Sequence, residues 1–215
     1  MSREPLILVG GGGHCKSVIE VVEASGQFSI AGIVDVSEKI GTEVSGYKVI
    51  AGDADLDLLV GSYRYFLVTV GQVRSGAVRS RLFHLIKSRG GILPTLIAPT
   101  AYVSGRATLG EGSVVHHHAF VNAGAQIGVN CIINTSALVE HDARIGDHCH
   151  IATAAVINGD CSVADHCFVG SHAVVAHGIT VASSCLIGAG AVVLTHTEAN
   201  TLYAGNPAVF KKKIQ

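Results

Sequence analysis

The chain has 215 residues, of which 48% are hydrophobic and only 5% are aromatic, and its formal net charge is −1. A charge this close to zero argues against a nucleic-acid partner. No apolar run reaches about 18 residues, which argues against a membrane partner. The N-terminus leads directly into a strand-like run, without the basic and apolar regions of a signal peptide, so we expect no secretory leader.

Residues 1–97 alternate apolar, strand-like runs with amphipathic segments. We expect strands and helices in the following places: strands over 6–9, 30–34, 47–50 and 65–70, and helices over 16–24 and 75–89. Strands that alternate with helices predict an α/β domain with a Rossmann-like parallel sheet. Pro94 and Pro99 then lead into a different pattern, so we expect a second domain over 98–215.

Four consecutive glycines, Gly10 to Gly13, follow the first expected strand and precede a helix that opens with His14 and Lys16. Glycines let the backbone approach a ligand closely, and the N–H groups at a helix N-terminus attract anions, so we predict a phosphate-binding loop. Cys15 stands where both the dinucleotide fingerprint and the P-loop require glycine, so neither NAD binding nor ATP hydrolysis is supported. Asp35 ends the second expected strand and is placed to accept hydrogen bonds from a ribose or a base. The alternative is a tight turn without a ligand.

From residue 103 to residue 193 every sixth residue is Val, Ile or Leu. Four residues after each of these, Ala, Ser or Cys fills every position from Ala107 to Ala191 except Ile179. A period of six is typical of a hexapeptide β-helix, in which each short strand forms one side of a triangular coil. We therefore predict a left-handed parallel β-helix in which three hexads make one coil, so residues 18 apart stack at roughly 4.8 Å.

The small interior position also accounts for most of the cysteines. It is occupied by Cys131, Cys149, Cys161, Cys167 and Cys185. Cys in such a position acts as a compact apolar side chain, so we expect neither disulfides nor metal binding. Free thiols indicate a reducing compartment, and hence a cytoplasmic protein.

Most of the 12 histidines need no special function, and the run from His116 to His118 is expected on the exterior of a coil. His172 and His177 show a spacing similar to that of zinc ligands in β-helical carbonic anhydrases. The third histidine of such a site would lie two coils earlier, where this chain has Ser136, so we expect no metal.

His141 is different because it stands at an expected coil corner, between Glu140 and Asp142. Gly159 follows 18 residues later, which places a backbone N–H without a side chain one coil away from the imidazole. Acyl transfer needs a base for the attacking amine or hydroxyl and a donor for the oxyanion. From the register alone, His141 is either this base or an ordinary surface histidine.

The motifs resemble those of the bacterial nucleotide-sugar acetyltransferases related to sialic acid O-acetyltransferase. The nearest resemblance is to the N-acetyltransferases that act on UDP-linked bacillosamine precursors and GDP-linked perosamine. The segments that carry the resemblance are Gly10–Lys16, Ile133–Asp142, His150, Asn158–Gly159, Ile187–Gly190 and Gly205–Ala208. They keep their order and span nearly the whole chain.

The resemblance implies a homotrimer without a metal, in which acetyl-CoA lies between neighbouring β-helices. It also implies that His141 is the catalytic base and that Asp142 is its acidic partner, a position that is Glu in some relatives. The acetyl-CoA site that it implies contains His150, Gly159, Gly188, Gly205 and Pro207. The sugar-nucleotide site that it implies contains Gly11, Gly12, Gly13, His14, Lys16, Asp35 and Asn134.

We therefore expect an acetyl-CoA-dependent N-acetyltransferase that acts on a nucleotide-linked amino-dideoxy sugar, of the GDP-perosamine or UDP-bacillosamine-precursor type. The amine attacks the thioester directly in a ternary complex, and His141 takes its proton. Two alternatives remain open: an O-acetyltransferase that acts on a sugar hydroxyl, and a non-catalytic β-helix trimer that senses a nucleotide. A nicotinamide oxidoreductase is disfavoured by the broken fingerprint.

Overall fold

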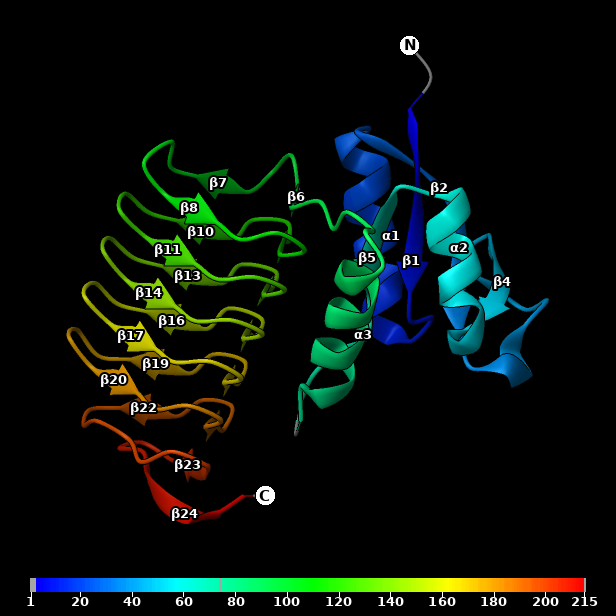
Figure 1. Ribbon diagram of the computed structural model, residues 1–215. Helices are drawn as coiled ribbons and strands as arrows, with labels where there is room; N and C mark the ends of the chain where they lie inside the picture. The colour runs from blue at the N-terminus through cyan, green and yellow to red at the C-terminus, as the bar shows by residue number, and fades with distance from the viewer. Residues whose placement is uncertain (1–2, 74, 215) are drawn as a thin grey trace.

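A computed structural model of the chain describes residues 3–73 and 75–214 and contains an α/β domain followed by a parallel β-helix (Figure 1). The α/β domain has a five-stranded sheet in the order β3-β4-β2-β1-β5. Its strands are β1 (Glu4–Val9), β2 (Phe28–Asp35), β3 (Glu43–Val44), β4 (Tyr47–Gly52) and β5 (Tyr65–Val68). All neighbours are parallel except β3, which pairs antiparallel with β4 at the edge. The predicted Rossmann-like sheet is thus confirmed.

Helices cover both faces of this sheet. The helical segments are α1 (Gly13–Ser25), α2 (Leu56–Ser62), α3 (Ala77–Ser88) and two 3₁₀ turns, η1 (Ser37–Lys39) and η2 (Asp53–Asp55). One core joins Leu6 and Leu8 of β1 to α1, and a second core joins Ile7 and Val9 to α2 and α3. The alternation of side chains along β1 therefore builds two cores, one on each face of the sheet.

The second domain coils through three sheets, in which all neighbouring strands are parallel except β23 and β24, which pair antiparallel at the end of one sheet. The domain-facing sheet contains β6 (Leu96–Ile97), β9 (Val114–Val115), β12 (Ile132–Ile133), β15 (His150–Ile151), β18 (Phe168–Val169), β21 (Leu186–Ile187), β23 (Thr201–Ala204) and β24 (Val209–Lys213). The apolar sheet contains β7 (Tyr102–Val103), β10 (Phe120–Val121), β13 (Leu138–Val139), β16 (Val156–Ile157), β19 (Val174–Val175) and β22 (Val192–Val193). The polar sheet contains β8 (Thr108–Leu109), β11 (Gln126–Ile127), β14 (Arg144–Ile145), β17 (Ser162–Val163) and β20 (Thr180–Val181).

The predicted stacking of residues 18 apart is confirmed for the strands from β6 to β22, whereas β23 pairs with β21 at a spacing of 16, as in Leu186 with Leu202. Phe120 pairs with Leu138, and Leu138 pairs in turn with Val156. The five cysteines of the small interior position are buried and have free thiols, and Cys149 donates a hydrogen bond to the carbonyl of Ala164 at 3.1 Å. The interior therefore holds its thiols as small side chains that bond to the backbone of the next coil.

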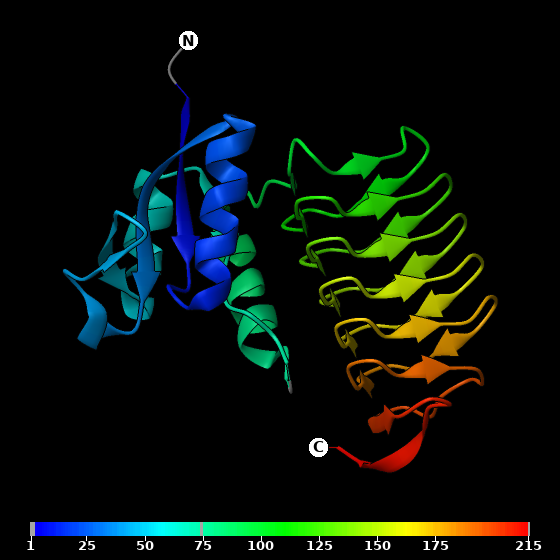
Figure 2. The same cartoon turned by 180° about the vertical axis from the view of Figure 1, so that it is seen from behind.

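The α/β domain lies against the domain-facing sheet, as the two views show (Figures 1 and 2). The same core that buries α1 continues into Leu96, Ala98 and Val114 at the start of the β-helix. The boundary predicted after residue 97 lies just after β6, which already pairs with β9. Within residues 3–73 and 75–214, none of the helices has the length and apolar character that crossing a membrane requires.

Candidate active site

The turn between β13 and β14 carries the predicted catalytic pair. Asp142 adopts the left-handed backbone conformation, with φ of 61°, which Asp tolerates better than most residues. This turn brings its Oδ2 to 3.0 Å from Nδ1 of His141, so the shorter Asp does reach the imidazole. The hydrogen bond with Asp142 raises the pKa of His141 above its ordinary value. We assign the Nδ1–H tautomer from this contact, which leaves Nε2 as the basic atom.

The backbone of the same turn is held by the preceding coil. The amide of Asn122 donates to Glu140 Oε2 at 2.6 Å, and the same oxygen accepts the His141 N–H at 3.2 Å. The side chains of His141 and Asp142 nevertheless remain 52% and 62% exposed. The base is therefore fixed at its backbone but open to an incoming substrate.

Gly159 lies directly against the imidazole, as the stacking of coils predicts. A Cβ at this position would lie 2.6 Å from both Nε2 and Cε1 of His141, so only glycine fits without moving the ring. The next residue, Asp160, donates its N–H to the His141 carbonyl at 3.2 Å and fixes the spacing of the two corners. Within the described residues the Gly159 N–H makes no hydrogen bond, so a donor without a partner lies beside the base.

In the glycine loop, Gly10 and Gly11 are tightly packed, whereas Gly12 and Gly13 face open space. At Gly10, whose φ is 111°, a Cβ would lie 2.5 Å from Cγ2 of Val70. Gly11 packs against Asp35, whose Oδ2 would lie 2.7 Å from an added Cβ. Gly12 and Gly13 have no atom within 4 Å of an added Cβ. They stand at the start of α1, whose first turn contains no acidic residue, so their backbone is open to an anion.

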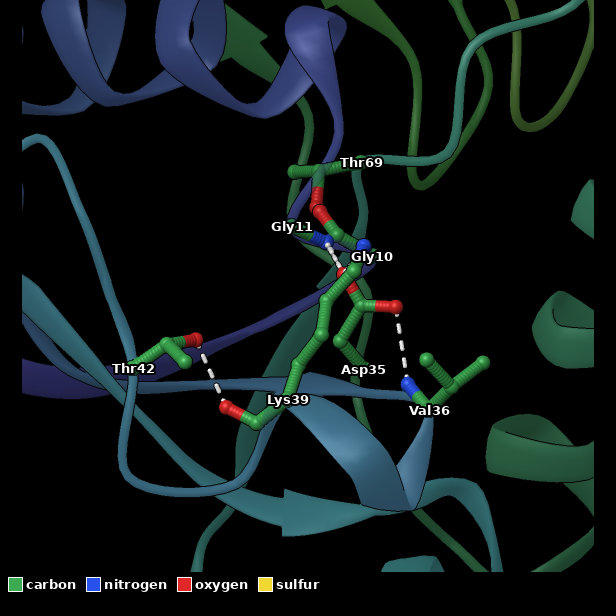
Figure 3. A network of polar contacts seen from close by, with 7 residues as sticks. All are labelled: Gly10, Gly11, Asp35, Val36, Lys39, Thr42 and Thr69. Atoms are coloured by element: carbon green, nitrogen blue, oxygen red, sulfur yellow. Dashed lines mark hydrogen bonds and ion pairs between the residues drawn. The ribbon is translucent and has the colours of Figure 1, made fainter.

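Asp35 anchors the loop, as Figure 3 shows. Its Oδ2 accepts the Gly11 N–H at 2.9 Å and Lys39 Nζ at 2.8 Å, and its Oδ1 accepts the Val36 N–H at 2.7 Å. Burial alone would raise the pKa of Asp35, but these hydrogen bonds outweigh it and lower the pKa. On the far side of the loop, Thr69 donates to the Gly10 carbonyl at 2.6 Å. The carboxylate predicted to meet a ribose or base thus also shapes the loop.

A cluster of histidines lies where the two domains meet. His150 is 8% exposed, donates from Nδ1 to the Gln72 carbonyl at 2.7 Å, and lies 3.2 Å through Nε2 from the amide of Asn134. His116 is 1% exposed, and its ring lies 5.2 Å from that of His14. Burial lowers the pKa of both His116 and His150 to about 4. His116 was expected on the coil exterior, and the α/β domain covers it there.

His116 and Gln72 are residues of this interface that were not predicted as part of a site. The sequence offers a signal for His116 alone, because it precedes Asn134 by 18 residues and therefore shares its corner. Lys16 is exposed on α1.

The remaining residues predicted for acetyl-CoA lie near the C-terminal end of the β-helix. Gly188 donates its N–H to the Tyr203 carbonyl at 2.8 Å and packs 3.0 Å, measured from an added Cβ, from Ala204. Gly205 and Pro207 form the turn that joins β23 to β24. These three residues are close to one another, at the end of the domain-facing sheet and away from the turn that carries His141.

Each of the two domains matches a known protein family. Residues 5–86 match the family described as the PglD N-terminal domain, and residues 97–207 match the GMPPB C-terminal domain. A histidine-to-asparagine mutant of perosamine N-acetyltransferase from Caulobacter crescentus, in complex with CoA and GDP-perosamine, is 34% identical over 97% of each chain, with a TM-score of 0.91. The chain belongs to the family of bacterial nucleotide-sugar N-acetyltransferases. 

A second member is similar over the whole chain. The acetyltransferase domain of PglB from Neisseria gonorrhoeae FA1090, in complex with acetyl coenzyme A, is 32% identical over 98% of this chain and 100% of that chain, with a TM-score of 0.88. A search of curated protein sequences gives no significant match.

Within a single chain of the protein, the turn that carries His141 and the glycine loop lie apart, although both belong to the predicted site. The turn between β13 and β14 lies on the side of the β-helix away from the α/β domain in both views (Figures 1 and 2). The glycine loop lies on the other side, because His14 at its end contacts His116 beside the domain-facing sheet. His141 therefore does not face the glycine loop of its own chain.

In the part of the chain that the structure describes, no group of three or more His, Cys, Asp or Glu residues is placed to hold a metal ion. Near the turn, His177 Nε2 lies 3.5 Å from Asp160 Oδ2, and its ring lies 6.4 Å from that of His141.

Proposed function

We propose that the protein transfers the acetyl group of acetyl-CoA to the amino group of a nucleotide-linked amino-dideoxy sugar, of the GDP-perosamine or UDP-bacillosamine-precursor type. The observation that carries this is the open Gly159 N–H beside the basic Nε2 of His141. It occurs in a chain that is 34% identical to an N-acetyltransferase solved with CoA and GDP-perosamine, which makes a GDP-sugar the first substrate to test.

The chemistry follows from these groups. The amine attacks the thioester carbonyl, and His141 Nε2 takes the proton that the nitrogen loses. Asp142 stabilises the imidazolium, while the Gly159 N–H donates to the oxyanion. The carbon–sulfur bond then breaks, and CoA leaves as a thiol with the proton returned from His141. A positioned base contributes about 10² to 10⁴-fold, and one oxyanion donor about 10² to 10³-fold.

A homotrimer completes the proposed site, and the outer side of the apolar sheet supports it. One residue per coil points outwards there: Tyr102, Phe120, Leu138, Val156, Val174 and Val192. Tyr102 is 54% exposed, and its ring stacks on that of Phe120 with centroids 4.7 Å apart. The polar sheet instead presents Thr, Gln, Arg and Ser, and the domain-facing sheet is already covered. An apolar ladder of this length indicates a protein interface.

Three copies that pack their apolar sheets around a three-fold axis bring opposite edges of that sheet together. One edge carries His141 and Gly159, and the other carries His116 and Asn134, next to the glycine loop. The base of one copy thus meets the sugar nucleotide bound by its neighbour. The same contact brings Gly159 of one copy towards Gly188 of the next, which forms a groove for acetyl-CoA between two β-helices. The buried free thiols support placing this trimer in the cytoplasm.

The test of the reaction is an assay with acetyl-CoA and matched acceptors: GDP-perosamine, a UDP-linked amino sugar, and the corresponding sugars with a hydroxyl in place of the amine. We expect transfer to the amine alone, with a product that resists the mild alkali that removes O-acetyl groups. Transfer to hydroxyl sugars would identify an O-acetyltransferase. Nucleotide binding without CoA release would identify a sensing protein.

A mixing experiment tests the shared site. At a nucleotide-sugar concentration near the wild-type KM, the His141→Ala and Gly12→Leu variants should each be nearly inactive in this arrangement, but a mixed trimer contains sites with an intact His141 from one copy and an intact glycine loop from its neighbour. Random assembly of equal amounts restores about one quarter of the sites, because each site draws on two neighbouring copies. A site within one chain would give no recovery.

A further inference from the structure

Arg79 on α3 is buried between the two domains, with 1% of its surface exposed. Its Nη1 donates to the carbonyls of Val68, at 3.1 Å, and Val70, at 2.6 Å. Its Nη2 donates to Asn130 in the β-helix, to the backbone carbonyl at 3.0 Å and to Oδ1 at 2.8 Å. One planar side chain thus joins the end of a sheet strand to a corner of the β-helix.

This guanidinium has no ionic partner among residues 3–73 and 75–214, where no carboxylate lies within ion-pair distance of it. Burial lowers the pKa of Arg79 to about 10, so it remains charged at neutral pH, and its Nε is buried without a hydrogen bond. A buried charge without a partner is costly, and an apolar side chain of similar size would be less so. Packing alone therefore does not explain an arginine here.

The carbonyls that Arg79 binds belong to the segment 68–72, which links the glycine loop of the α/β domain to His150 of the β-helix. At one end of this connection, Thr69 donates to the Gly10 carbonyl of the glycine loop at 2.6 Å. At the other end, the Gln72 carbonyl accepts Nδ1–H of His150 at 2.7 Å. Arg79 holds the chain on both sides of Thr69, at Val68 and Val70, and ties it to Asn130.

We propose that Arg79 is a positioning residue for acetyl transfer, which sets the placement of the glycine loop relative to the β-helix and thereby of the sugar amine relative to the base. This rests on the proposed function. The β-helix contacts fix where His141 of the neighbouring copy lies, whereas the domain interface fixes where the sugar nucleotide lies. Lys87 of α3 also reaches the β-helix, through an exposed ion pair with Glu111 at 2.8 Å, but Arg79 is buried and binds both domains at once. It therefore controls the reach of the amine without touching either substrate.

The decisive variant is Arg79→Met, with Arg81→Met as the matched control. Arg81 lies on the same helix, but its side chain is 58% exposed. It forms a long ion pair with Asp53, in which Nη2 lies 3.5 Å from Oδ2. In Arg79→Met the glycine loop and Asp35 stay whole within the α/β domain, and the acetyl-CoA groove between β-helices is unchanged, so both KM values should stay within about three-fold of the wild type. The kcat should fall about 10²-fold, since a displacement of about 1 Å costs that much. Arg81→Met should leave kcat unchanged.

A purely stabilising role would lower the Tm of Arg79→Met and leave kcat of the folded enzyme unchanged, and this result would overturn the proposal. If Arg79→Met does not assemble, Arg79→Lys and Asn130→Ala carry the test. A lysine cannot serve carbonyls on two domains at once. Alanine at position 130 keeps the backbone carbonyl but removes the Oδ1 contact with Arg79, together with the contact of Nδ2 with His148 Nδ1 at 3.0 Å. Both variants should lower kcat by about 10-fold with little change in KM. Wild-type kcat in both would refute the inference. A wild type without activity on any nucleotide amino sugar would instead refute the proposed function.

Discussion

Gly159→Ala should displace the His141 imidazole without removing any chemical group of the catalytic corner. The added Cβ would lie 2.6 Å from Nε2 and Cε1 of His141, about 1 Å inside normal contact, so the ring must move. Because the ring is 52% exposed, it can move without disturbing the core, and the free energy of unfolding should change by less than about 0.5 kcal/mol. A base displaced by about 1 Å should lower kcat about 10²-fold.

Steady-state kinetics of a double-mutant cycle measure this effect. His141→Ala should lower kcat by about 10² to 10⁴-fold, and Gly159→Ala should add little to it, because the displaced ring is then already absent. Gly105→Ala is the matched control. Gly105 occupies the same position of this corner three coils before Gly159, and an added Cβ there meets no atom within 4 Å.

Full activity of a folded Gly159→Ala trimer would refute this reasoning. The reasoning would also be refuted if the fold-losses of kcat of the two single variants multiplied in the double variant, because Gly159→Ala would then act on something other than His141. Equal losses in Gly105→Ala would show that any methyl group at this corner disturbs the assembly.

Three further predictions follow from the same contacts. Asp142→Asn replaces the carboxylate beside His141 Nδ1 with a neutral amide, which stabilises the imidazolium less, so the acid limb of the pH profile of kcat/KM should move to lower pH while kcat falls; an unmoved limb would separate Asp142 from the base. An added Cβ at Gly12 has no atom of the fold within 4 Å, so Gly12→Leu should raise the KM for the nucleotide sugar strongly and leave the KM for acetyl-CoA and the Tm unchanged; equal changes in both KM values would contradict two separate sites. Burial lowers the pKa of His116 and His150 from 6.5 to about 4, so the unfolded chain takes up protons first, and stability present above pH 6.5 is lost as the pH falls towards 4. At about pH 5 this amounts to about 2 kcal/mol for each histidine. Thermal unfolding should show this loss, and His150→Gln should reduce it; a Tm independent of pH in this window would show that the interface accepts the charge.

The β-helix was predictable because every hexad repeats the same local rule. Ile133 pairs with Val115 on one side and Ile151 on the other, so a single period fixes all the strand pairs. The same rule placed Gly159 against His141 without any knowledge of the fold around them. By contrast, α2 escaped prediction because Leu56 is its only buried residue, and a helix that buries one side chain shows no amphipathic period.

The domain interface was not predictable, because nothing periodic connects its partners. Arg79 and Asn130 are 51 residues apart, and Gln72 and His150 are 78 apart, in segments with different patterns. Sequence reasoning therefore left His116 on an exterior surface. It was equally unable to foresee that Asp35 would hold the glycine loop, because that contact depends on how the ends of two strands lie side by side.

The exposure of the catalytic pair gives the proposed trimer a chemical role as well as a structural one. In a single chain, His141 is half exposed and its pKa is raised, so a water molecule on Nε2 would compete with the sugar amine for a bound thioester. Electrostatic stabilisation of an oxyanion by one N–H is strongest where water is excluded. In the trimer that we propose, the neighbour's α/β domain would cover this corner and carry the nucleotide sugar to it. The part that delivers the acceptor is then also the part that excludes water, and Arg79, by setting how that domain sits on its own β-helix, governs both.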